Sequence, residues 1–417
     1  MDEPSGVLPA RGLRDAVVAG WIQSAHTIPR ANIQPASVDL RLGPTAYALR
    51  CSFLPAPGVS VMARAADLTL EEIDIRDGAT LERERPYLIP LAEQLALPNE
   101  IYGKANPKSS TGRLDVFTRV ITDGHNRFDE IRPGYHGQLY LEVVPRSFAV
   151  KVKELLSLNQ LRIATGAARV SDAELPGVHA RTPLLFDGER PLEPDELAIS
   201  DGLFLSVDLT ARRRKPVGYR AKKNSQRVDL SETGLYDWRE FWEPVYAERG
   251  DRLVLEPEVF YLLLSAEGVC VPPGYAAEMM AYDPTAGELR THYAGFFDPG
   301  FGFDKAGHRF GSQAALEVRA RAPFMVEHRQ PICKLAFERM IEEPDTLYRR
   351  RGRLALPGAR DDAQQTLHGA ARAARAMPAR PVASSPLASS RCSSREPRGP
   401  LRPRHWPLAL DGRGSSV

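Results

Sequence analysis

The chain carries one stretch of sequence twice, and this internal repeat limits the folds that it can adopt. Leu81–Pro98 reads LERERPYLIPLAEQLALP and Leu255–Pro272 reads LEPEVFYLLLSAEGVCVP, with eight identical residues at a constant offset of 174 (272 − 98). The tetrapeptide SVDL at Ser37–Leu40 also returns, at Ser206–Leu209. A repeat of this length exceeds one supersecondary unit of a solenoid. It predicts two fused copies of a small domain, in which each copy is free to lose residues that the other supplies.

The bulk composition allows two hydrophobic cores and excludes several classes of protein. The chain has 417 residues, of which 43% are hydrophobic. Lys and Arg (55) nearly balance Asp and Glu (53), so the charge favours neither nucleic acid nor a membrane as partner. Four scattered cysteines without a CxxC pair argue against disulfides and zinc and favour a reducing compartment. With no signal pattern or bilayer-spanning apolar run, we expect a cytoplasmic protein.

Most of the chain predicts β-strands. Short segments rich in β-branched and aromatic residues are bounded by Pro, Gly or Asn, as in PYLIPLA, QLYLEVV and VFYLLLS. The 35 Pro and 32 Gly favour a compact sandwich or roll over a βαβ sheet. Apolar spacing predicts an amphipathic helix over 11–22, and we expect short helices at 149–162 and 170–175. The aromatic segment 234–247 is expected to connect and support the two domains.

We divide the chain into a first domain at 1–200, a second at 201–346 and a tail at 347–417. The tail consists mainly of Arg, Ala, Pro, Ser and Gly, which predicts disorder because it offers little apolar surface to bury. Few aromatic residues lie between its arginines to stack on bases, so we predict no nucleic-acid binding. A shifted reading frame late in a GC-rich gene is one hypothesis for this composition.

One segment of the first copy has the composition of a phosphate site. NPKSSTGRLDVF places two adjacent serine hydroxyls and a glycine between two cations, namely Lys108, Ser109, Ser110, Gly112 and Arg113. Hydroxyl donors and positive charge suit phosphate oxygens, and a glycine lets the backbone approach closely. The GxxxxGK[ST] order of a Walker loop is absent. Taken alone, the hexapeptide KSSTGR is more typical of a solvated turn.

Ile33–Gly43 supplies the context for this motif. Asp39 and Arg41 alternate with apolar residues on one face of an expected strand, which by itself is typical of a sheet edge. Together with KSSTGR and the motifs below, this segment resembles the dCTP deaminase and trimeric dUTPase superfamily over most of 5–345. The resemblance is closest to its long, two-domain deaminases. It implies a mostly-β fold of two tandem dUTPase-like domains, each a distorted jelly roll of the β-clip type, with a few short helices.

The two copies match different halves of the family's site. Lys108, Ser109, Ser110 and Arg113 match its RSSxxR-like phosphate motif, with Lys in place of the first Arg. The family's ID-P-G-[WY]-x-G motif is EIRPGYHG in the first copy, where Arg132 replaces the Asp. In the second copy it is AGFFDPGFG, with Asp298 intact, but nothing there resembles KSSTGR. We therefore expect one composite site at the junction of the copies, and a homo-oligomer or pseudo-oligomer.

The resemblance implies hydrolytic deamination of dCTP to dUTP and ammonia without zinc. The H-x-E and P-C-x-x-C signature of zinc deaminases is absent. A carboxylate would then take the proton from water, and its place in the family is the Glu of an LE pair. Glu142 in YLEVV and Glu317 in ALEVR both qualify. We favour Glu142 slightly because its motif is less interrupted. At least one of the two is expected in an ion pair instead, with Arg146 or Arg319.

The remaining site residues also follow from the resemblance. Ser109 and Arg113 are expected to orient water and neutralise phosphate charge, and Mg²⁺ to arrive on the substrate triphosphate without a protein ligand set. RQPICKLAF, headed by Arg329 and Gln330, resembles the family's fourth motif, although a core strand explains it as well. Residues 218–231 resemble its closing segment, although a basic surface loop is an equal alternative. The predicted substrate-binding residues are Lys108, Ser109, Ser110, Arg113, Asp39, Asp298, Tyr219, Lys222 and Gln330.

Two other functions stay open at the level of sequence. Asp298 in AGFFDPG resembles a dUTPase motif, so a dUTPase or a bifunctional deaminase–diphosphatase is the first alternative. The glycine-rich arm of dUTPases is missing from the sequence after Tyr348, which disfavours it. The second alternative is a nucleotide-binding protein whose sites have lost catalysis.

Overall fold

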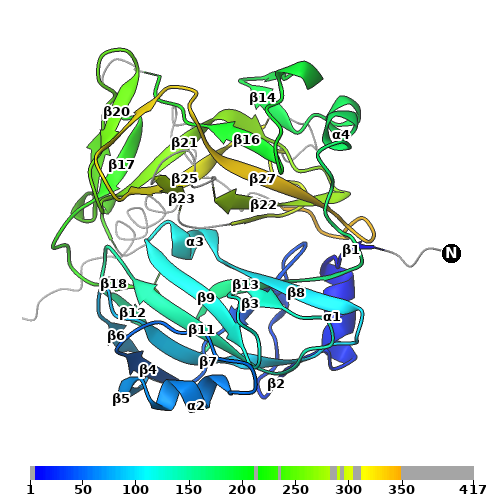
Figure 1. Cartoon of the computed structure of the whole chain (residues 1–417), viewed down its shortest axis with the longest axis vertical. Coiled ribbons are helices and arrows are strands. Elements are labelled where there is room, and N and C mark those ends of the chain that lie inside the picture. The colour runs from blue at the N-terminus through cyan, green and yellow to red at the C-terminus, as the bar shows by residue number, and fades with distance from the viewer. Residues whose placement is uncertain are drawn as a thin grey trace, which may run out of the picture. The chain divides into compact units, whose positions relative to one another are not determined.

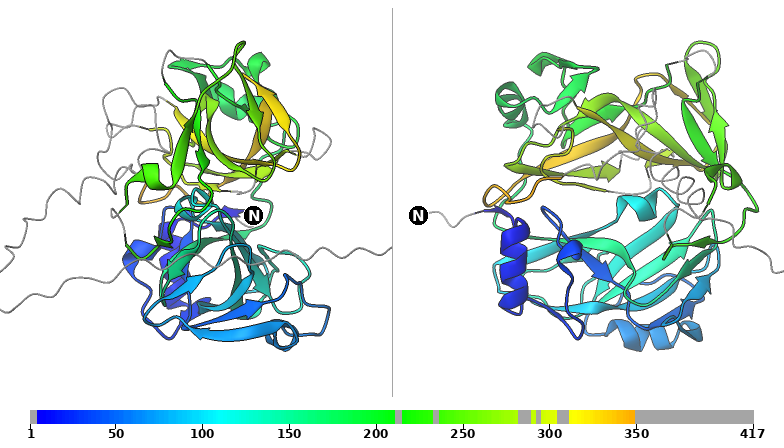
Figure 2. Two further views of the ribbon diagram at one scale, coloured as in Figure 1. Left: turned by 90° about the vertical axis from the view of Figure 1, so that its left-hand side faces the viewer. Right: turned by 180° about the vertical axis from the view of Figure 1, so that it is seen from behind.

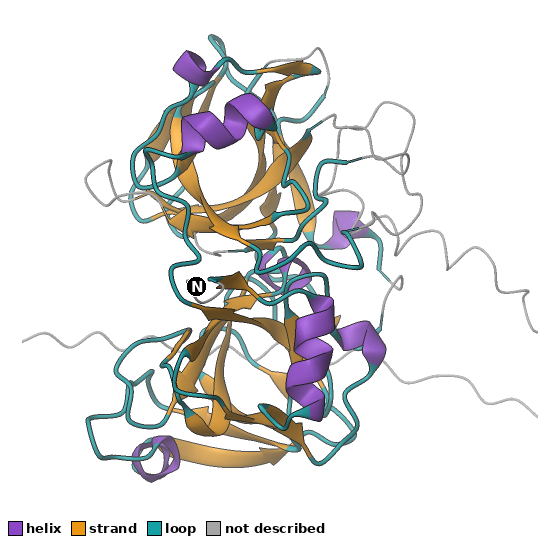
Figure 3. Cartoon of the chain, turned by 90° about the vertical axis from the view of Figure 1, so that its right-hand side faces the viewer, coloured by secondary structure: helices purple, strands orange, loops and turns teal. Residues whose placement is uncertain are grey.

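The computed structural model describes residues 5–210, 215–232, 236–281, 289–291, 295–303 and 311–348, without the side chains of 281 and 289–291 (Figure 1). The described residues are mostly β, as predicted. They include four short α-helices: α1 (Ala10–Val18), α2 (Val61–Ala66), α3 (Ser109–Gly112) and α4 (Leu175–Arg181). Helices α1, α2 and α4 lie at the periphery of the strands, which dominate every view (Figures 2 and 3). No helix in the described ranges is long and apolar enough to span a membrane.

The first half of the chain forms two main sheets and a small one. One sheet joins β3 (Val38–Arg41), β13 (Ser157–Thr165), β8 (Ile101–Pro107) and β10 (Glu130–Ile131), with β1 (Gly6–Val7) beside β13. The other has the order β5 (Thr69–Asp74), β4 (Thr45–Leu49), β7 (Tyr87–Ala96), β11 (His136–Pro145) and β9 (Val116–Thr122), with β2 (Ile22–Ser24) beside β7. The small sheet joins β18 (Val228–Asp229), β12 (Val150–Val152) and β6 (Ala79–Leu81).

The second half forms a matching set of sheets. One has the order β16 (Leu203–Ser206), β27 (Pro331–Arg339), β22 (Tyr275–Ala281) and β24 (Phe296–Phe297). Another has the order β15 (Arg190–Pro191), β14 (Leu185–Asp187), β21 (Phe260–Val269), β17 (Gly218–Ala221) and β19 (Trp242–Val245). In that sheet β25 (Ser312–Ala320) pairs with β21, and β23 (Leu289–Thr291) pairs with β25. A two-stranded sheet joins β20 (Arg252–Leu255) and β26 (Phe324–Glu327).

The repeat in the sequence corresponds to a repeat of strand pairing. The order β3-β13-β8-β10 in the first half matches β16-β27-β22-β24 in the second. The hydroxyl of Tyr87 accepts a hydrogen bond from the Glu82 backbone at 2.9 Å, and that of Tyr261 accepts one from the Glu256 backbone at 3.0 Å. The contact in the second half thus repeats the contact in the first half at the offset of 174 seen in the sequence. The offset therefore identifies residues with the same place in each half over much of the repeat.

The second SVDL tetrapeptide is not part of this correspondence. Val38 pairs with Leu161 in the first half. Leu335, which lies 174 positions after Leu161, pairs with Leu203 in the second half. Position 203 thus takes the place of position 38, and the SVDL at Ser206–Leu209 lies later than the true counterpart. As a result, the strand that carries Asp39 in the first half has Phe204 at the matching position in the second.

The boundary between the halves lies earlier in the chain than predicted. Val170, Leu175 and Leu184 pack in the core of the second half, together with residues of β21, β25 and β27. The first domain therefore ends near residue 169 and not at 200. The helix predicted at 149–162 is wrong, because Val150–Val152 and Ser157–Thr165 form β12 and β13 with alternating or continuous burial.

The aromatic segment around residue 240 joins the halves, as predicted for 234–247. Trp242 lies on β19, in a sheet of the second half, yet both Phe241 and Trp242 are buried in the core of the first half. Their rings lie edge-on to Phe148, each at a centroid distance of 5.5 Å. Burial of three large aromatic side chains gives this junction a substantial apolar contribution. Of the tail predicted to be disordered at 347–417, positions 349–417 lie outside the described residues.

Candidate active site

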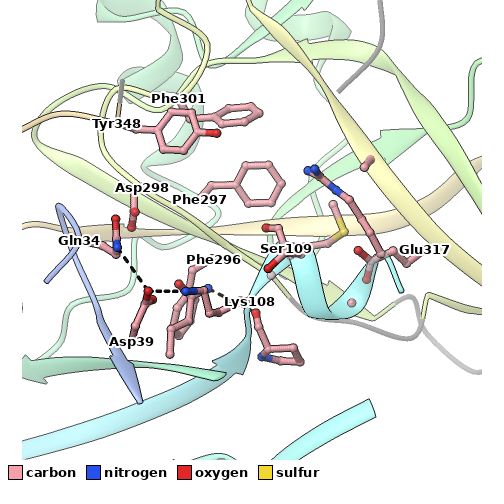
Figure 4. A pocket seen from close by; sticks show the side chains of 18 of the residues that line it. Gln34, Asp39, Lys108, Ser109, Phe296, Phe297, Asp298, Phe301, Glu317 and Tyr348 are labelled. Carbon is pink, nitrogen blue, oxygen red and sulfur yellow. Dashed lines mark hydrogen bonds and ion pairs between the residues drawn. The ribbon is translucent and has the colours of Figure 1, made fainter. Parts of the chain in front are cut away.

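A cavity of about 280 Å³ is lined by both halves of the chain (Figure 4). The first half contributes Gln34, Asp39, Pro107, Lys108, Ser109, Ser110, Gly112, Arg113 and Gln160. The second half contributes Met279, Gly295, Phe296, Phe297, Asp298, Phe301, Gln313, Ala315, Glu317 and Tyr348. The structure thus brings the KSSTGR motif, Asp39, Asp298 and one of the two candidate glutamates into a single composite cavity.

The phosphate-type motif forms the one-turn helix α3 at the edge of the cavity. Strand β8 ends at Pro107, and the Lys108 backbone then donates to the Leu158 oxygen at 3.0 Å. The chain turns immediately, and the Gly112 backbone donates to the Lys108 oxygen, also at 3.0 Å. This tight turn after a sheet strand presents the two serine hydroxyls and Arg113 to the same cavity.

Glu317 packs directly against the glycine of this motif. A Cβ atom added to Gly112 would lie 2.4 Å from the Oε2 atom of Glu317, so only glycine leaves room for the carboxylate. The side chain of Glu317 is buried on β25. Burial raises the pKa of Glu317 to about 8, with Arg113 opposing this increase and Asp115 adding to it. A carboxyl group with a pKa near neutrality can both take and return a proton.

Asp298 is the second carboxylate at the cavity, and an arginine of the first half lies beside it. Burial raises the pKa of Asp298 to about 6, opposed by Arg162 and assisted by Asp39. The guanidinium of Arg162, on β13, lies 3.7 Å from the Asp298 carboxylate and donates to the Phe297 oxygen at 2.9 Å. It also forms an ion pair with Glu338 at 3.0 Å. The first half therefore fixes the loop that carries Asp298.

Asp39 and Lys108 form an ion pair on the cavity wall. The Nζ atom of Lys108 donates to the Asp39 carboxylate, and Gln34 donates to the same carboxylate at 3.4 Å (Figure 4). The Asp39 side chain is 7% exposed and that of Lys108 is 27% exposed. The lysine of the phosphate-type motif is therefore held in place while its ammonium still borders the cavity.

An aromatic cluster that the sequence interpretation missed covers the other end of the cavity. Phe301 contacts Phe297 edge-on at a centroid distance of 4.9 Å and contacts Tyr348 at 5.6 Å (Figure 4). The Tyr348 backbone is fixed by a 2.7 Å hydrogen bond to the Pro299 oxygen. Phe297 and Phe301 lie on either side of Asp298 in AGFFDPGFG, and this spacing is the sequence pattern from which the cluster could have been predicted. Flat aromatic surfaces suit a planar ligand such as a nucleobase.

Comparisons with known proteins identify the family of this chain. Residues 4–167 match the family model of the 2′-deoxycytidine 5′-triphosphate deaminase (DCD) N-terminal domain, and 171–355 match that of its C-terminal domain. A crystal structure of 2′-deoxycytidine 5′-triphosphate deaminase from Agrobacterium tumefaciens is 41% identical in sequence to this chain, with a TM-score of 0.76. The alignment covers 82% of this chain and 100% of that one. The chain belongs to the DCD family.

Curated relatives match a shorter region. A protein of Methanothermobacter thermautotrophicus named "dCTP deaminase, dUMP-forming" is 29% identical over 116 residues, which cover 28% of this chain and 55% of that protein. A protein of Haloarcula marismortui named "dCTP deaminase" is 28% identical over 116 residues, covering 28% of this chain and 56% of that one. The chain thus spans about half the length of the curated relatives that it matches.

Glu142, the favoured candidate base, does not reach the cavity of this DCD family member. It lies on β11, directly opposite Arg119 on β9, whose Nε atom donates to its carboxylate at 3.0 Å. The guanidinium of Arg119 also lies 3.6 Å from the ring centroid of Phe128. An ion pair was expected for one of the two glutamates, but the partner is Arg119 and not Arg146 or Arg319. The geometry therefore disfavours Glu142 as the base.

Three further predicted site residues of this DCD protein also lie away from the cavity. Tyr219 on β17 packs in the core with its ring 5.2 Å from that of Trp238. The Nζ atom of Lys222 donates to the Arg239 backbone oxygen at 2.6 Å. Gln330, in the turn between β26 and β27, accepts a hydrogen bond from the Glu327 backbone at 3.1 Å. Residues 218–231 thus include two sheet strands, β17 and β18, in place of a segment folded over the cavity.

Proposed function

We propose that this chain hydrolyses dCTP to dUTP and ammonia, as a step of pyrimidine deoxynucleotide synthesis. The observation that carries the proposal is the contact between Glu317 of the second half and Gly112 of the first half's KSSTGR motif. This contact places a carboxyl group with a raised pKa beside hydroxyls and cations suited to a triphosphate. Family membership and the names of the relatives point to the same substrate.

In the proposed reaction Glu317 acts as general base and then as general acid. It takes one proton from water while the water oxygen bonds to C4 of cytosine, and it returns this proton to N3. The remaining hydroxyl proton then passes through Glu317 to the amino group. The C4–N bond breaks, a C4 carbonyl forms, and ammonia leaves. Water activation is therefore assigned to Glu317, without zinc.

The rest of the cavity binds and orients the nucleotide in this proposal. Lys108, Ser109, Ser110 and Arg113 would contact the triphosphate, as two cations and two hydroxyl donors. Because Glu317 acts on C4, the base would lie beside Glu317, and Asp298 and the aromatic cluster would contact the rest of the nucleotide. The described residues offer no group of three or more His, Cys, Asp or Glu that could hold a metal ion. In this proposal Mg²⁺ is held through the phosphate oxygens and water, where it neutralises charge.

A product assay tests this proposal. Purified protein is incubated with dCTP and Mg²⁺, and the nucleotides are separated by chromatography. We expect dUTP from the unmodified protein, and a decrease in turnover of about 10² to 10⁴-fold for Glu317→Gln. Glu142→Gln is the matched variant and is expected to keep turnover. A loss of turnover in Glu142→Gln alone would reassign the base, and dCTP binding without any turnover would indicate a non-catalytic protein.

A bifunctional deaminase that also releases pyrophosphate is the second candidate. Asp298 borders the cavity, and relatives from Methanothermobacter thermautotrophicus and Coprothermobacter proteolyticus carry the name "dCTP deaminase, dUMP-forming". The same chromatogram separates the two functions, because dUMP and pyrophosphate would accumulate in place of dUTP. Feeding dUTP directly shows whether the second step proceeds independently of deamination.

A further inference from the structure

A buried ion pair joins the two halves close to Glu317. Asp115 lies two residues after Arg113, where the chain leaves α3, with a φ of 55°. Arg319 lies two residues after Glu317 on β25, and side chains two apart on a strand share a face. The guanidinium of Arg319 donates to the Asp115 carboxylate. The two side chains are only 6% and 1% exposed.

Both members of this pair have further fixed contacts. Ser147 donates to the Asp115 carboxylate at 2.5 Å, and the Arg146 backbone donates to the Asp115 oxygen at 2.9 Å. Arg319 also donates to the Glu258 backbone oxygen, and the Glu258 carboxylate lies 3.5 Å from Arg146. Because the network includes residues of both halves, it fixes α3 and β25 relative to each other.

We propose that Asp115 is a positioning residue for Glu317, because its pairing with Arg319 locks β25 against α3 and neutralises a cation near the carboxyl group. The inference rests on the proposed function, in which Glu317 is the base. Burial and the negative charge of Asp115 both raise the pKa of Glu317, which reaches about 8. Arg319 without the Asp115 carboxylate beside it would act in the opposite direction. The pair thus keeps the pKa of Glu317 in the range where the carboxyl group can both take and return a proton.

The charged groups around Glu317 come from several elements. Arg113 faces it from the end of α3, and Asp115 from the turn that follows. Arg319 lies on its own strand, with Glu258 and Arg146 at the far end of the network. Strand β23 pairs with β25, but its side chains lie outside the described part of the chain. Asp115 is therefore the neighbour whose charge can be removed with the least change of shape, by substitution with Asn.

Two variants and two measurements test the inference. Asp115→Asn leaves Arg319 with the Glu258 carboxylate, at 3.8 Å, as its ionic partner, and Asp115→Asn with Arg319→Gln removes both charges. The first measurement is ¹³C NMR of protein labelled at the glutamate carboxyl carbons, with the Glu317 signal identified by its loss in Glu317→Gln. The second is the pH profile of kcat/KM for dCTP. In Asp115→Asn we expect the pKa of Glu317, and the acid limb of the profile, to fall by about one pH unit or more.

The double variant keeps the test valid if the single variant does not fold. A buried pair replaced on both sides is tolerated better than one broken on one side. We expect its Glu317 pKa between those of the unmodified protein and Asp115→Asn. Lys104→Gln with Glu278→Gln is the matched control, because it removes another ion pair between the halves.

The outcomes separate the inference from the proposed function. An unchanged Glu317 pKa in both variants, with thermal stability lowered as in the control, would overturn the inference and leave a purely structural pair. A shifted NMR titration without deamination of dCTP would support the inference on the environment of Glu317 and reject the proposed function. Deamination of dCTP with an unshifted NMR titration would support the proposed function and reject the inference on the environment of Glu317.

Discussion

Arg162 on β13 of the first half donates to the backbone oxygen of Phe297 on β24 of the second half, at 2.9 Å. A second bond of 2.9 Å reaches the Ala277 oxygen on β22, and the Phe296 ring centroid lies 4.0 Å from the guanidinium. The Arg162 side chain is only 2% exposed. One buried cation thus organises the loop of the opposite half that leads to Asp298.

Arg162→Lys is therefore expected to weaken nucleotide binding. An ammonium group cannot reproduce the planar fork of the guanidinium, so at least one buried backbone oxygen loses its donor. We expect KM for dCTP to rise about 10-fold or more, with a smaller change in kcat, because the loop that carries Asp298 is displaced. Steady-state kinetics measures both constants. Arg169→Lys, at an exposed ion pair, is the control, and an equal effect there would contradict the role of Arg162.

Gly112→Ala should separate catalysis from stability. The added Cβ would lie 2.4 Å from Oε2 of Glu317, so the carboxylate has to move although the backbone does not. We expect kcat to fall about 10 to 100-fold while the melting temperature changes little. Gly274→Ala is the matched control, since a Cβ there has no neighbour within 4 Å. Unchanged kcat in Gly112→Ala would mean that Glu317 needs no fixed position.

The pKa of Glu317 predicts how stability depends on pH. Because the folded state raises this pKa from 4.5 to about 8, it holds a proton that the unfolded state has lost between these values. This contribution to stability is present at low pH and is lost as the pH rises through 8. Thermal unfolding at pH 6 and pH 8 should show a smaller decrease for Glu317→Gln than for the unmodified protein. Glu130→Gln, at an exposed site, should behave like the unmodified protein.

Arg119 is expected to matter for folding and not for the reaction. Arg119→Met leaves the Glu142 carboxylate, which is 1% exposed, without its cation. We expect a loss of about 3 kcal/mol of unfolding free energy, measured by urea denaturation. Combining Arg119→Met with Glu142→Leu should recover much of that loss, because the buried charge is then removed as well. A loss of dCTP turnover in a double variant of normal stability would place Glu142 in the reaction.

The structure explains which site residues the sequence could predict. Lys108 to Arg113 are neighbours in the sequence and fold as one turn, so their motif can be recognised from the sequence alone. The choice between Glu142 and Glu317 depended on which residue lies opposite in the sheet. Arg119 faces Glu142 from β9, and the spacing of 23 residues between them carries no recognisable pattern.

The fold itself was easier to predict than the position of its parts. The mostly-β class and the two halves follow from strand-type segments and from the repeat. Tyr219 and Lys222 were misplaced because strand pairing, which is a long-range property, puts their segment in β17 beside β21 and β19. The role of Arg162 could not be predicted from the sequence for the same reason, since all its partners in the second half are more than 100 residues away.

Lys104 and Glu278 form an ion pair across the halves, and they lie 174 positions apart, the spacing of the repeat. Each residue therefore contacts its own counterpart, which places both residues next to a rotation axis that relates the two copies, such as an approximate two-fold axis. In a dimer of two identical chains this position would bring two like charges together. A single chain that encodes both copies can place a cation against an anion there, so covalent linkage permits a dyad contact that strict symmetry forbids.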